Sequence, residues 1–151
     1  MTLPAHVDAD TARGIDPRGP RFGAALTALL LIASILLGPG AGTAVLAVVV
    51  ISFMVGAIRG PGGTWQGWLY RRAVRPRLGP PVELEDPEPP RFAQTVGLVI
   101  TGVGLGLTLL GVTWALPVFA ALALVAAGLN AVTGFCLGCQ MYLLLVRLRR
   151  A

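Results

Sequence analysis

The sequence predicts an all-α membrane protein in which four transmembrane helices form two helical hairpins, with both termini cytoplasmic. Three observations lead to this prediction. Hydrophobic residues occupy 55% of the 151 positions and charged residues only 13%, whereas about a quarter of a soluble domain is charged. The mean hydropathy of +0.76 is correspondingly high. Four long apolar segments divide the chain, and its arginines are grouped between them in a regular order.

The apolar segments cover residues 22–37, 43–58, 92–110 and 117–146. A helix of about 20 residues crosses the hydrocarbon core of a bilayer, so the first two segments are slightly short and the fourth is long enough to continue beyond the membrane. Each segment is apolar on all sides, which excludes the alternating pattern of a membrane β-barrel. The expected organisation is a flexible polar N-terminus (1–14), a first hairpin (15–58), a cytoplasmic amphipathic segment with a Pro-rich acidic linker (59–91), a second hairpin (92–148) and a basic tail (149–151).

All twelve basic residues are arginines, and they determine the predicted topology. They precede the first apolar segment, separate the second from the third, and follow the fourth: Arg13, Arg18, Arg21; Arg59, Arg71, Arg72, Arg75, Arg77, Arg91; Arg147, Arg149, Arg150. The other two connectors carry no charge. By the positive-inside rule, both termini and the central loop face the cytoplasm of a bacterial plasma membrane. This placement also makes anionic lipid headgroups, and not nucleic acid, the expected partner of the net charge of +5.

An internal repeat relates the two predicted hairpins. "DPRGPRFGA" (16–24) recurs as "DPEPPRFAQ" (86–94), seventy residues later. Because both copies precede a hairpin that enters from the cytoplasm, the repeat is parallel, with its axis along the membrane normal. Continuing the alignment places "GTWQGWLY" (63–70) opposite "GFCLGCQMY" (134–142), so that Trp65 and Trp68 correspond to Cys136 and Cys139.

Residues 64–77, "TWQGWLYRRAVRPR", are typical of a short amphipathic helix on the membrane surface. Trp65 and Trp68 would face lipid, and the arginines would lie at the headgroups or contact a partner protein. These arginines are Arg71, Arg72, Arg75 and Arg77. The third apolar segment contains a G-x-x-x-G pair at Gly102 and Gly106, which predicts close helix packing there.

The two cysteines of the chain, Cys136 and Cys139, form a C-x-x-C pair. Residues at i and i+3 share one face of a helix, close enough for a disulfide with small adjustment. If Gly134 breaks the helix, Cys136 falls in a new first turn, where free N–H groups and the helix dipole stabilise a thiolate. The arginines of the tail, Arg147, Arg149 and Arg150, add positive potential, whereas burial in hydrocarbon would oppose ionisation.

Several neighbours support the pair as a candidate catalytic site: Gly134, Gly138, Asn130, Gln140 and Tyr142. The alternative is that both cysteines are small apolar residues in a helix contact. A permanent disulfide is disfavoured because the cytoplasm is reducing. The only histidine, His6, lies in the polar N-terminus, so neither a metal nor a cofactor site is expected within one chain.

Four motifs give the chain a resemblance to a known family: "IDPRGPRF" (15–22), "RRAVRPRLGPP" (71–81), "LEDPEPPRFAQ" (84–94) and "NAVTGFCLGCQMY" (130–142). The sequence resembles the actinobacterial membrane family described as domain of unknown function 4395, over residues 15–148. The resemblance carries no established activity. It does imply an association with thioredoxin-like and sulfurtransferase proteins, and so a role in thiol or sulfur traffic at the membrane.

The leading hypothesis is a membrane thiol–disulfide or persulfide relay, in which Cys136 attacks and Cys139 resolves the mixed disulfide. The alternative is a non-enzymatic scaffold that anchors a soluble thioredoxin-like or sulfurtransferase protein. A third hypothesis is a pore for a small neutral or sulfur compound. A second copy of the chain is a further candidate partner.

Overall fold

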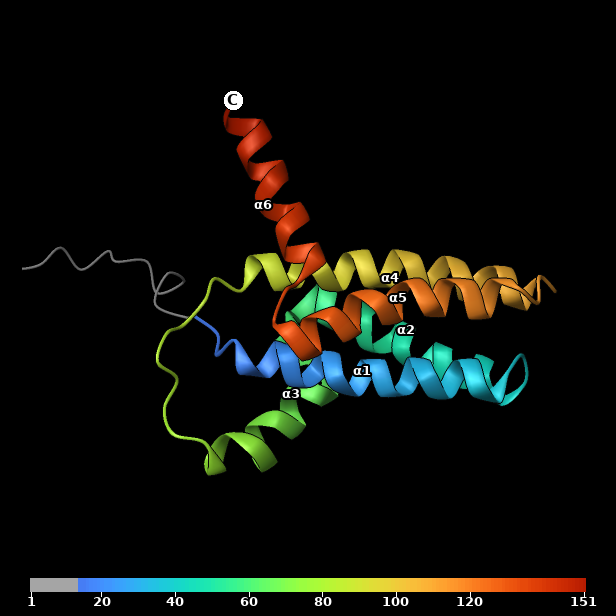
Figure 1. Ribbon diagram of the computed structural model, residues 1–151, viewed down its shortest axis with the longest axis horizontal. Coiled ribbons are helices and arrows are strands. Elements are labelled where there is room, and N and C mark those ends of the chain that lie inside the picture. The colour runs from blue at the N-terminus through green and yellow to red at the C-terminus, as the bar shows by residue number, and fades with distance from the viewer. Residues whose placement is uncertain (1–13) are drawn as a thin grey trace, which may run out of the picture.

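The computed structural model describes residues 14–151 and shows a bundle of four long helices with two shorter helical arms (Figure 1). The long helices are α1 (Arg18–Leu37), α2 (Ala41–Arg59), α4 (Glu88–Leu109) and α5 (Ala115–Thr133). Each is long and apolar enough to cross a membrane. The residues expected to form a flexible N-terminus, including His6, lie outside the described part of the chain, apart from Gly14.

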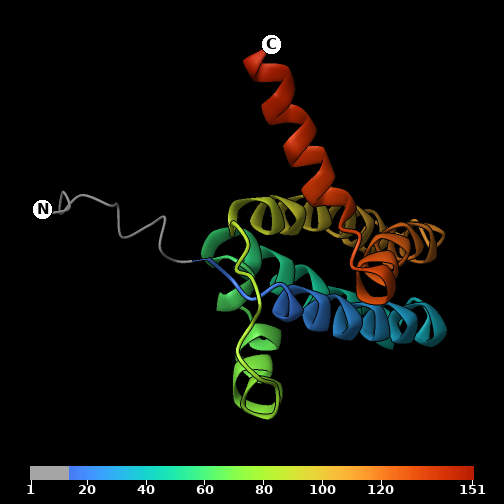
Figure 2. The ribbon, with the colours of Figure 1, turned by 60° about the vertical axis from the view of Figure 1, so that its left-hand side comes forward.

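The two arms leave the bundle on opposite sides, near the end where α1 and α4 begin (Figures 1 and 2). One is α6 (Leu137–Arg150). The other is a succession of turns in place of the single amphipathic helix predicted for residues 64–77. It comprises the 3₁₀ turn η1 (Pro61–Gly63), α3 (Trp65–Leu69), the π-helical turn η2 (Tyr70–Val74) and the 3₁₀ turn η3 (Arg75–Arg77).

Helices α1 and α4 each begin four residues before the predicted apolar segment. The first turn of a helix has N–H groups without partners inside the helix, and an aspartate supplies one in both cases. Asp16 accepts a hydrogen bond from the Arg18 N–H at 3.0 Å, and Asp86 accepts one from the Glu88 N–H at 2.9 Å. The polar Asp-Pro motifs are therefore helix starts, and the following prolines and arginines belong to the first turn.

The fourth predicted segment, residues 117–146, holds two separate helices, divided at Gly134, where the sequence left a helix break open. Helix α5 ends at Thr133, and Gly134 adopts a left-handed conformation with φ 76°. The Gly134 N–H donates to the Asn130 carbonyl at 2.9 Å, which completes a helix C-terminus that glycine adopts without strain. The chain then turns, and α6 starts at Leu137. The second hairpin thus ends before the cysteines.

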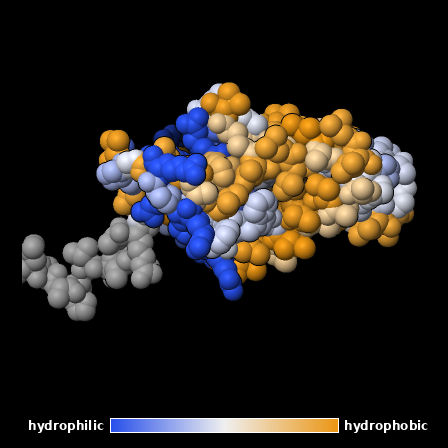
Figure 3. All heavy atoms as spheres, turned by 90° about the horizontal axis from the view of Figure 1, so that it is seen from below, coloured by the Kyte–Doolittle hydropathy of each residue, from blue (hydrophilic) through white to orange (hydrophobic). Residues whose placement is uncertain are grey.

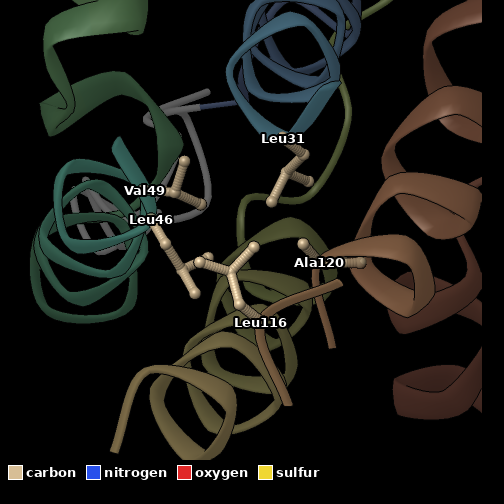
Figure 4. Packing of buried hydrophobic residues seen from close by; sticks show 6 residues of the cluster. Leu31, Leu46, Val49, Leu116 and Ala120 are labelled. Atoms are coloured by element: carbon tan, nitrogen blue, oxygen red, sulfur yellow. The ribbon is translucent and has the colours of Figure 1, made fainter. Parts of the chain in front are cut away.

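Packing differs between the two ends of the bundle. Helix α1 lies mainly against α5, and α2 lies mainly against α4. Towards the turns that join α1 to α2 and α4 to α5, buried apolar side chains from three helices fill the centre (Figure 4): Leu31 from α1, Leu46 and Val49 from α2, and Leu116 with Ala120 from α5. All five are buried. Dispersion contacts in this dense core hold the helices together in a bilayer.

The predicted G-x-x-x-G contact is wrong in its register. A Cβ added at Gly102 or Gly106 would meet open space. Gly104, between them, lies against the Phe119 side chain of α5. In the first hairpin, the Ser34 hydroxyl donates to the Gly42 carbonyl at 2.8 Å and joins α1 to α2. Small residues therefore do allow close helix approach, but on the opposite face of α4.

The outer surface of the bundle is apolar over most of its length, with hydrophilic residues gathered at one end (Figure 3). Large apolar side chains such as Leu36, Ile58, Leu122 and Val125 are more than half exposed. Exposed apolar area of this extent is incompatible with water and is what a lipid-facing surface requires. The protein is therefore a multi-pass helical membrane protein. We call the end with the hydrophilic residues, where α1 and α4 begin, the open end.

Candidate functional site: a cysteine pair beside an intramembrane cavity

Cys136 and Cys139 lie at the open end, where the chain passes from α5 into α6. Cys136 is the N-cap of α6, and its Sγ accepts a hydrogen bond from the Cys139 N–H at 3.2 Å. The two residues are joined by a disulfide, with their Cα atoms 5.2 Å apart. The N-cap position turns the Cys136 sulfur towards the free N–H groups of the first turn of α6, which favours negative charge on that sulfur.

The cation beside the turn that joins α5 to α6 is Arg21 of α1. The arginines of the tail lie farther away. The tail arginines occupy the last turn of α6, which points away from the bundle. The Arg21 guanidinium donates to the Val132 carbonyl at 3.2 Å, and its side chain lies about 3.5 Å from where a Cβ of Gly134 would be. The sequence placed Arg21 at a membrane boundary but gave no signal that it meets the cysteine-bearing turn.

The predicted supporting residues separate into two groups. Asn130, Gly134 and Gly138 line the same cavity as the cysteines. Gly138 must be small, because a Cβ there would lie 2.6 Å from Ala93 of α4. Gln140 is exposed and meets the pair only through its backbone N–H, which donates to the Cys136 carbonyl. Its side chain is not part of the site.

Tyr142, the last predicted supporting residue, fixes α6 to the bundle. Its ring packs on Phe92 of α4, with ring centroids 5.7 Å apart. A matching pair, Phe22 and Tyr70, lies 5.9 Å apart and fixes the other arm to α1. Aromatic pairs of this geometry contribute about 0.5–1.5 kcal/mol beyond their burial. Tyr142 therefore has a structural role.

A cavity of about 590 Å³ occupies the centre of the bundle at the open end. It exists because the residues facing inward are small, among them Gly23, Ala93, Gly97 and Ala127, where the other end of the bundle has leucines. Both cysteines line this cavity. Polar side chains line it as well, among them those of Thr27, Gln66, Gln94 and Asn130. Its size lies within the range of about 300–1,000 Å³ typical of small-molecule sites.

Gln66 is a member of the cavity wall that sequence reasoning missed. Only 4% of it is exposed, and its Oε1 has no hydrogen-bond partner. Its Nε2 reaches only the Thr27 hydroxyl, at 3.5 Å. Whichever way the amide is turned, one of its polar atoms stays unpaired, and buried polar groups of this kind are rare. The segment was predicted on the membrane surface, yet α3 places Gln66 beneath α1.

The predicted interface residues have defined contacts of their own. The Trp65 indole N–H donates to the Ser52 hydroxyl at 2.7 Å, and Arg72 lies 5.8 Å from the centre of the Trp68 ring. The Arg71 guanidinium donates to the Gly62 carbonyl. Arg75 and Arg77 are exposed. Both tryptophans remain about half exposed, as side chains at a membrane interface would be.

Asp16 links the start of α1 to the arm that carries Gln66. Its carboxylate accepts hydrogen bonds from the Arg18 guanidinium at 2.9 Å and from the Tyr70 hydroxyl at 2.8 Å. The hydrogen bond from Arg18, helped by that from Tyr70, lowers the pKa of Asp16 to about 2 despite its burial. Beside it, Ile15 and Glu85 exchange two backbone hydrogen bonds, at 2.8 and 2.9 Å.

The fold and the site together define a helical membrane protein with a C-x-x-C disulfide at the start of a helix that follows its fourth span. The chain belongs to the family described as domain of unknown function 4395 (DUF4395), which matches residues 15–147. That match takes in all four long helices, both cysteines and most of α6. No curated protein and no solved structure matches the chain.

Proposed function

We propose that the protein is a membrane thiol–disulfide relay that exchanges electrons with a cytoplasmic thioredoxin-like protein. The observation that carries this proposal is the disulfide at the start of α6, with Cys136 at the N-cap. Cysteines at helix N-termini in a C-x-x-C pair have lowered pKa values and exchange rapidly. We expect the pKa of the reduced Cys136 thiol to lie below the ordinary value of about 8.5, because the N–H groups of α6 and the nearby Arg21 favour the thiolate.

The exchange conserves atoms and electrons. A thiolate of the reduced partner attacks Cys136 Sγ, the Cys136–Cys139 bond breaks, and Cys139 leaves as a thiolate that takes up a proton. The partner's second thiolate then attacks its own half of the mixed disulfide and releases Cys136. The relay gains two electrons, and the partner leaves as a disulfide. The reverse sequence reduces the partner. A persulfide on Cys136, resolved by Cys139, is the related alternative with a sulfurtransferase as partner.

The proposal places the site on the cytoplasmic side, and the distribution of arginines supports this orientation. Arg18, Arg21, Arg59 and Arg91 all lie at helix ends that form the open end. The connectors at the opposite end carry no charge. By the positive-inside rule, both termini and the open end face the cytoplasm. Maleimide labelling of inverted vesicles, compared with right-side-out vesicles, tests this orientation: labelling of reduced protein only from outside right-side-out vesicles would contradict it.

We further propose that the two halves are a parallel repeat about an axis along the membrane normal. An arginine in each half makes the same kind of contact, in each case with the end of a helix in the other half. Arg21 of α1 donates to carbonyls at the end of α5, and Arg91 of α4 donates to Ala57 and Ile58 at the end of α2. The backbone pair Ile15 and Glu85 joins positions seventy residues apart. Contact between equivalent positions occurs at a two-fold axis.

The N-caps of α3 and α6 favour a repeat alignment that differs by one residue from the alignment expected from the sequence. Thr64 is the N-cap of α3 and accepts the Gly67 N–H at 3.1 Å, as Cys136 accepts the Cys139 N–H in α6. The counterparts of the cysteines are then Thr64 and Gly67, and not Trp65 and Trp68. In this alignment the second thiol of the relay replaces a glycine.

Trapping of a mixed disulfide tests the relay. Cys139→Ser protein in nanodiscs is activated at Cys136 as a mixed disulfide with glutathione. It should then form a stable mixed disulfide with a reduced thioredoxin whose second C-x-x-C cysteine is replaced by serine, because no second thiolate can release Cys136. Cys136→Ser protein, activated in the same way at Cys139, is the matched control and should trap at least about tenfold less, because its sulfur lacks the N-cap position. Equal trapping by both variants, or none by either, would sink the proposal.

The exposed arginines of the other arm favour a scaffold as the second candidate function. Arg75 and Arg77 are exposed on a turn beyond the bundle. Arg71 and Arg72 are poorer test positions, because both have contacts within the chain. A scaffold predicts that Arg75→Glu with Arg77→Glu releases a bound partner while Cys136→Ser with Cys139→Ser does not. Co-purification of a tagged chain from its own cells measures both.

A further inference from the structure

The cavity has two facing walls of different chemistry. One wall carries the disulfide and Gly138, from the start of α6, and the other carries Gln66 and Thr27, from α3 and α1. Gly138 lies against Ala93 of α4, while the Gln66 side chain lies against Gly23 of α1. Residues 23 and 93 are equivalent helix positions in the two copies of the repeated motif. The amide and the disulfide are therefore at similar depth, on opposite sides of one space.

The cavity extends from the polar mouth into the apolar middle of the membrane. Its mouth includes Arg18 and Glu85, and its inner walls include Ile100 of α4 and Leu122 of α5. At 1.5 Å per residue, Leu122 lies about 16 Å from the end of α5, near the centre of a bilayer. Leu122 is also 54% exposed, and the helices of this bundle present their exposed apolar side chains to lipid. The cavity thus reaches a lipid-facing residue, which gives a lipid-soluble molecule a path in from the side.

The unpaired amide of Gln66 identifies the polar chemistry that an occupant needs. An amide offers both a donor and an acceptor, and a buried polar atom without a partner costs about 1–3 kcal/mol. A molecule with an oxygen that is a carbonyl in one state and a hydroxyl in another would pair with Gln66 in both. Together with apolar walls and a neighbouring two-electron disulfide, this requirement selects one class of compound.

We propose that the cavity binds a lipid-soluble quinone, with its ring beside Cys136 and Cys139 and one ring oxygen at Gln66 and Thr27. This inference rests on the proposed relay and names its electron acceptor. After a partner has reduced the pair, the Cys136 thiolate bonds to a ring carbon. The Cys139 thiolate then attacks Cys136 Sγ, and the sulfur–carbon bond breaks with its electron pair on the ring. The two protons lost by the thiols end on the two ring oxygens, giving a quinol and the disulfide.

Binding is tested separately from thiol chemistry, with Cys136→Ser/Cys139→Ser protein in phosphatidylcholine nanodiscs and decylubiquinone as the probe. Trp65, next to Gln66 in the chain, reports occupancy by fluorescence quenching. We expect Gln66→Leu and Thr27→Val each to weaken binding about tenfold, the equivalent of one hydrogen bond of about 1.4 kcal/mol. Thr95→Val is the matched control and should bind normally, because Thr95 is exposed and bonds only to its own helix.

Electron transfer is measured next, by mixing reduced protein with decylubiquinone and following the quinone absorbance. We expect one quinol for each disulfide formed, a rate about tenfold lower in Gln66→Leu, and none in Cys136→Ser. If Gln66→Leu and Thr27→Val bind and react like the parent protein, the quinone site is overturned, and a lipid chain is the remaining occupant. If the parent protein also does not exchange disulfides with thioredoxin, the proposed relay is overturned as well. Exchange with thioredoxin but no quinone binding would overturn only this inference.

Discussion

The two halves of the molecule differ in the connector that follows the second helix of each hairpin. In the first half four residues, Gly60 to Gly63, separate the end of α2 from the N-cap Thr64. In the second half only Gly134 and Phe135 separate the end of α5 from the N-cap Cys136. The longer connector forms the turn η1, which lies over the start of α3. The shorter one leaves the start of α6 open to the cavity.

This difference in connector length explains why only the second half has room for a cysteine pair at the start of its helix. A Cβ at Gly67 would lie 2.5 Å from the Pro61 carbonyl oxygen, so the turn η1 excludes any side chain at the third helical position. The corresponding position in the second half has room for the Cys139 sulfur. The first half instead turns Gln66 into the cavity where the second half has Gly138. One half supplies the thiols, and the other supplies the polar wall opposite them.

The largest expected effect on stability comes from Gly67, the position in the first half that the turn η1 covers. Gly67→Ala should lower the free energy of unfolding by about 2 kcal/mol, because backbone atoms of Pro61 and Gly62 must move to admit the methyl group. Cys139→Ala, at the matching position, should change it by less than about 1 kcal/mol in reducing detergent solution. Unfolding midpoints of both variants check this. Equal losses would show that connector length does not set the difference.

The second prediction concerns the helix starts, Asp16 in the first half and Asp86 in the second. Asp16 accepts bonds from Arg18 and Tyr70, whereas Asp86 is exposed. Because the folded pKa of Asp16, about 2, is below its ordinary value of 3.8, its ionised form stabilises the fold above about pH 4. Asp16→Asn should cost about 1–2 kcal/mol at neutral pH, allowing for solvent around Arg18. Asp86→Asn should cost less than about 0.5 kcal/mol.

The pH dependence gives the control for this pair. The contribution of Asp16 is lost as the pH falls from about 4 through about 2, so the parent protein and Asp16→Asn should converge in stability over that range. The parent and Asp86→Asn should stay parallel. Thermal unfolding in detergent at stepped pH measures both. A stability gap between the parent and Asp16→Asn that persists at pH 2 would contradict the ion pair as its cause.

The smallest expected effect on stability comes from Arg21 and Arg91, and the two residues should differ in their effect on the Cys136 thiol. Each donates to the last carbonyls of a helix in the other hairpin, so Arg21→Gln and Arg91→Gln should each lower stability by about 1 kcal/mol. Only Arg21→Gln should also raise the pKa of the reduced Cys136 thiol, because Arg21 lies beside Gly134. The pH midpoint of maleimide labelling measures that shift. A similar shift in Arg91→Gln would remove Arg21 from the site.

The sequence was sufficient to predict the four long helices. Apolar segments of the right length and uncharged connectors encode these features locally. The division of the fourth segment could not be decided from the sequence, because apolar residues continue after Gly134 and the left-handed conformation of that glycine is what separates the two helices. The Gly104 contact was missed for a related reason: the spacing of small residues does not say which face of a helix meets a neighbour.

The candidate site was only half visible in the sequence. The cysteines are recognisable because C-x-x-C is a local spacing. Gln66, Thr27 and Arg21 come from other segments, and their roles depend on how α1 and α3 lie against the turn before α6. A cavity arises from small residues on several helices at one depth, and no single segment encodes it. A glutamine within an otherwise aromatic and glycine-rich stretch was the one available signal.

The arginine contacts between the two halves have a consequence for how the protein is made. When the first hairpin enters the membrane, the carbonyls of Ala57 and Ile58 at the end of α2 still lack their partner, because Arg91 has not been synthesised. Arg21 must likewise wait for the end of α5. The helix ends of each hairpin are therefore paired only when residues of the other hairpin have been made.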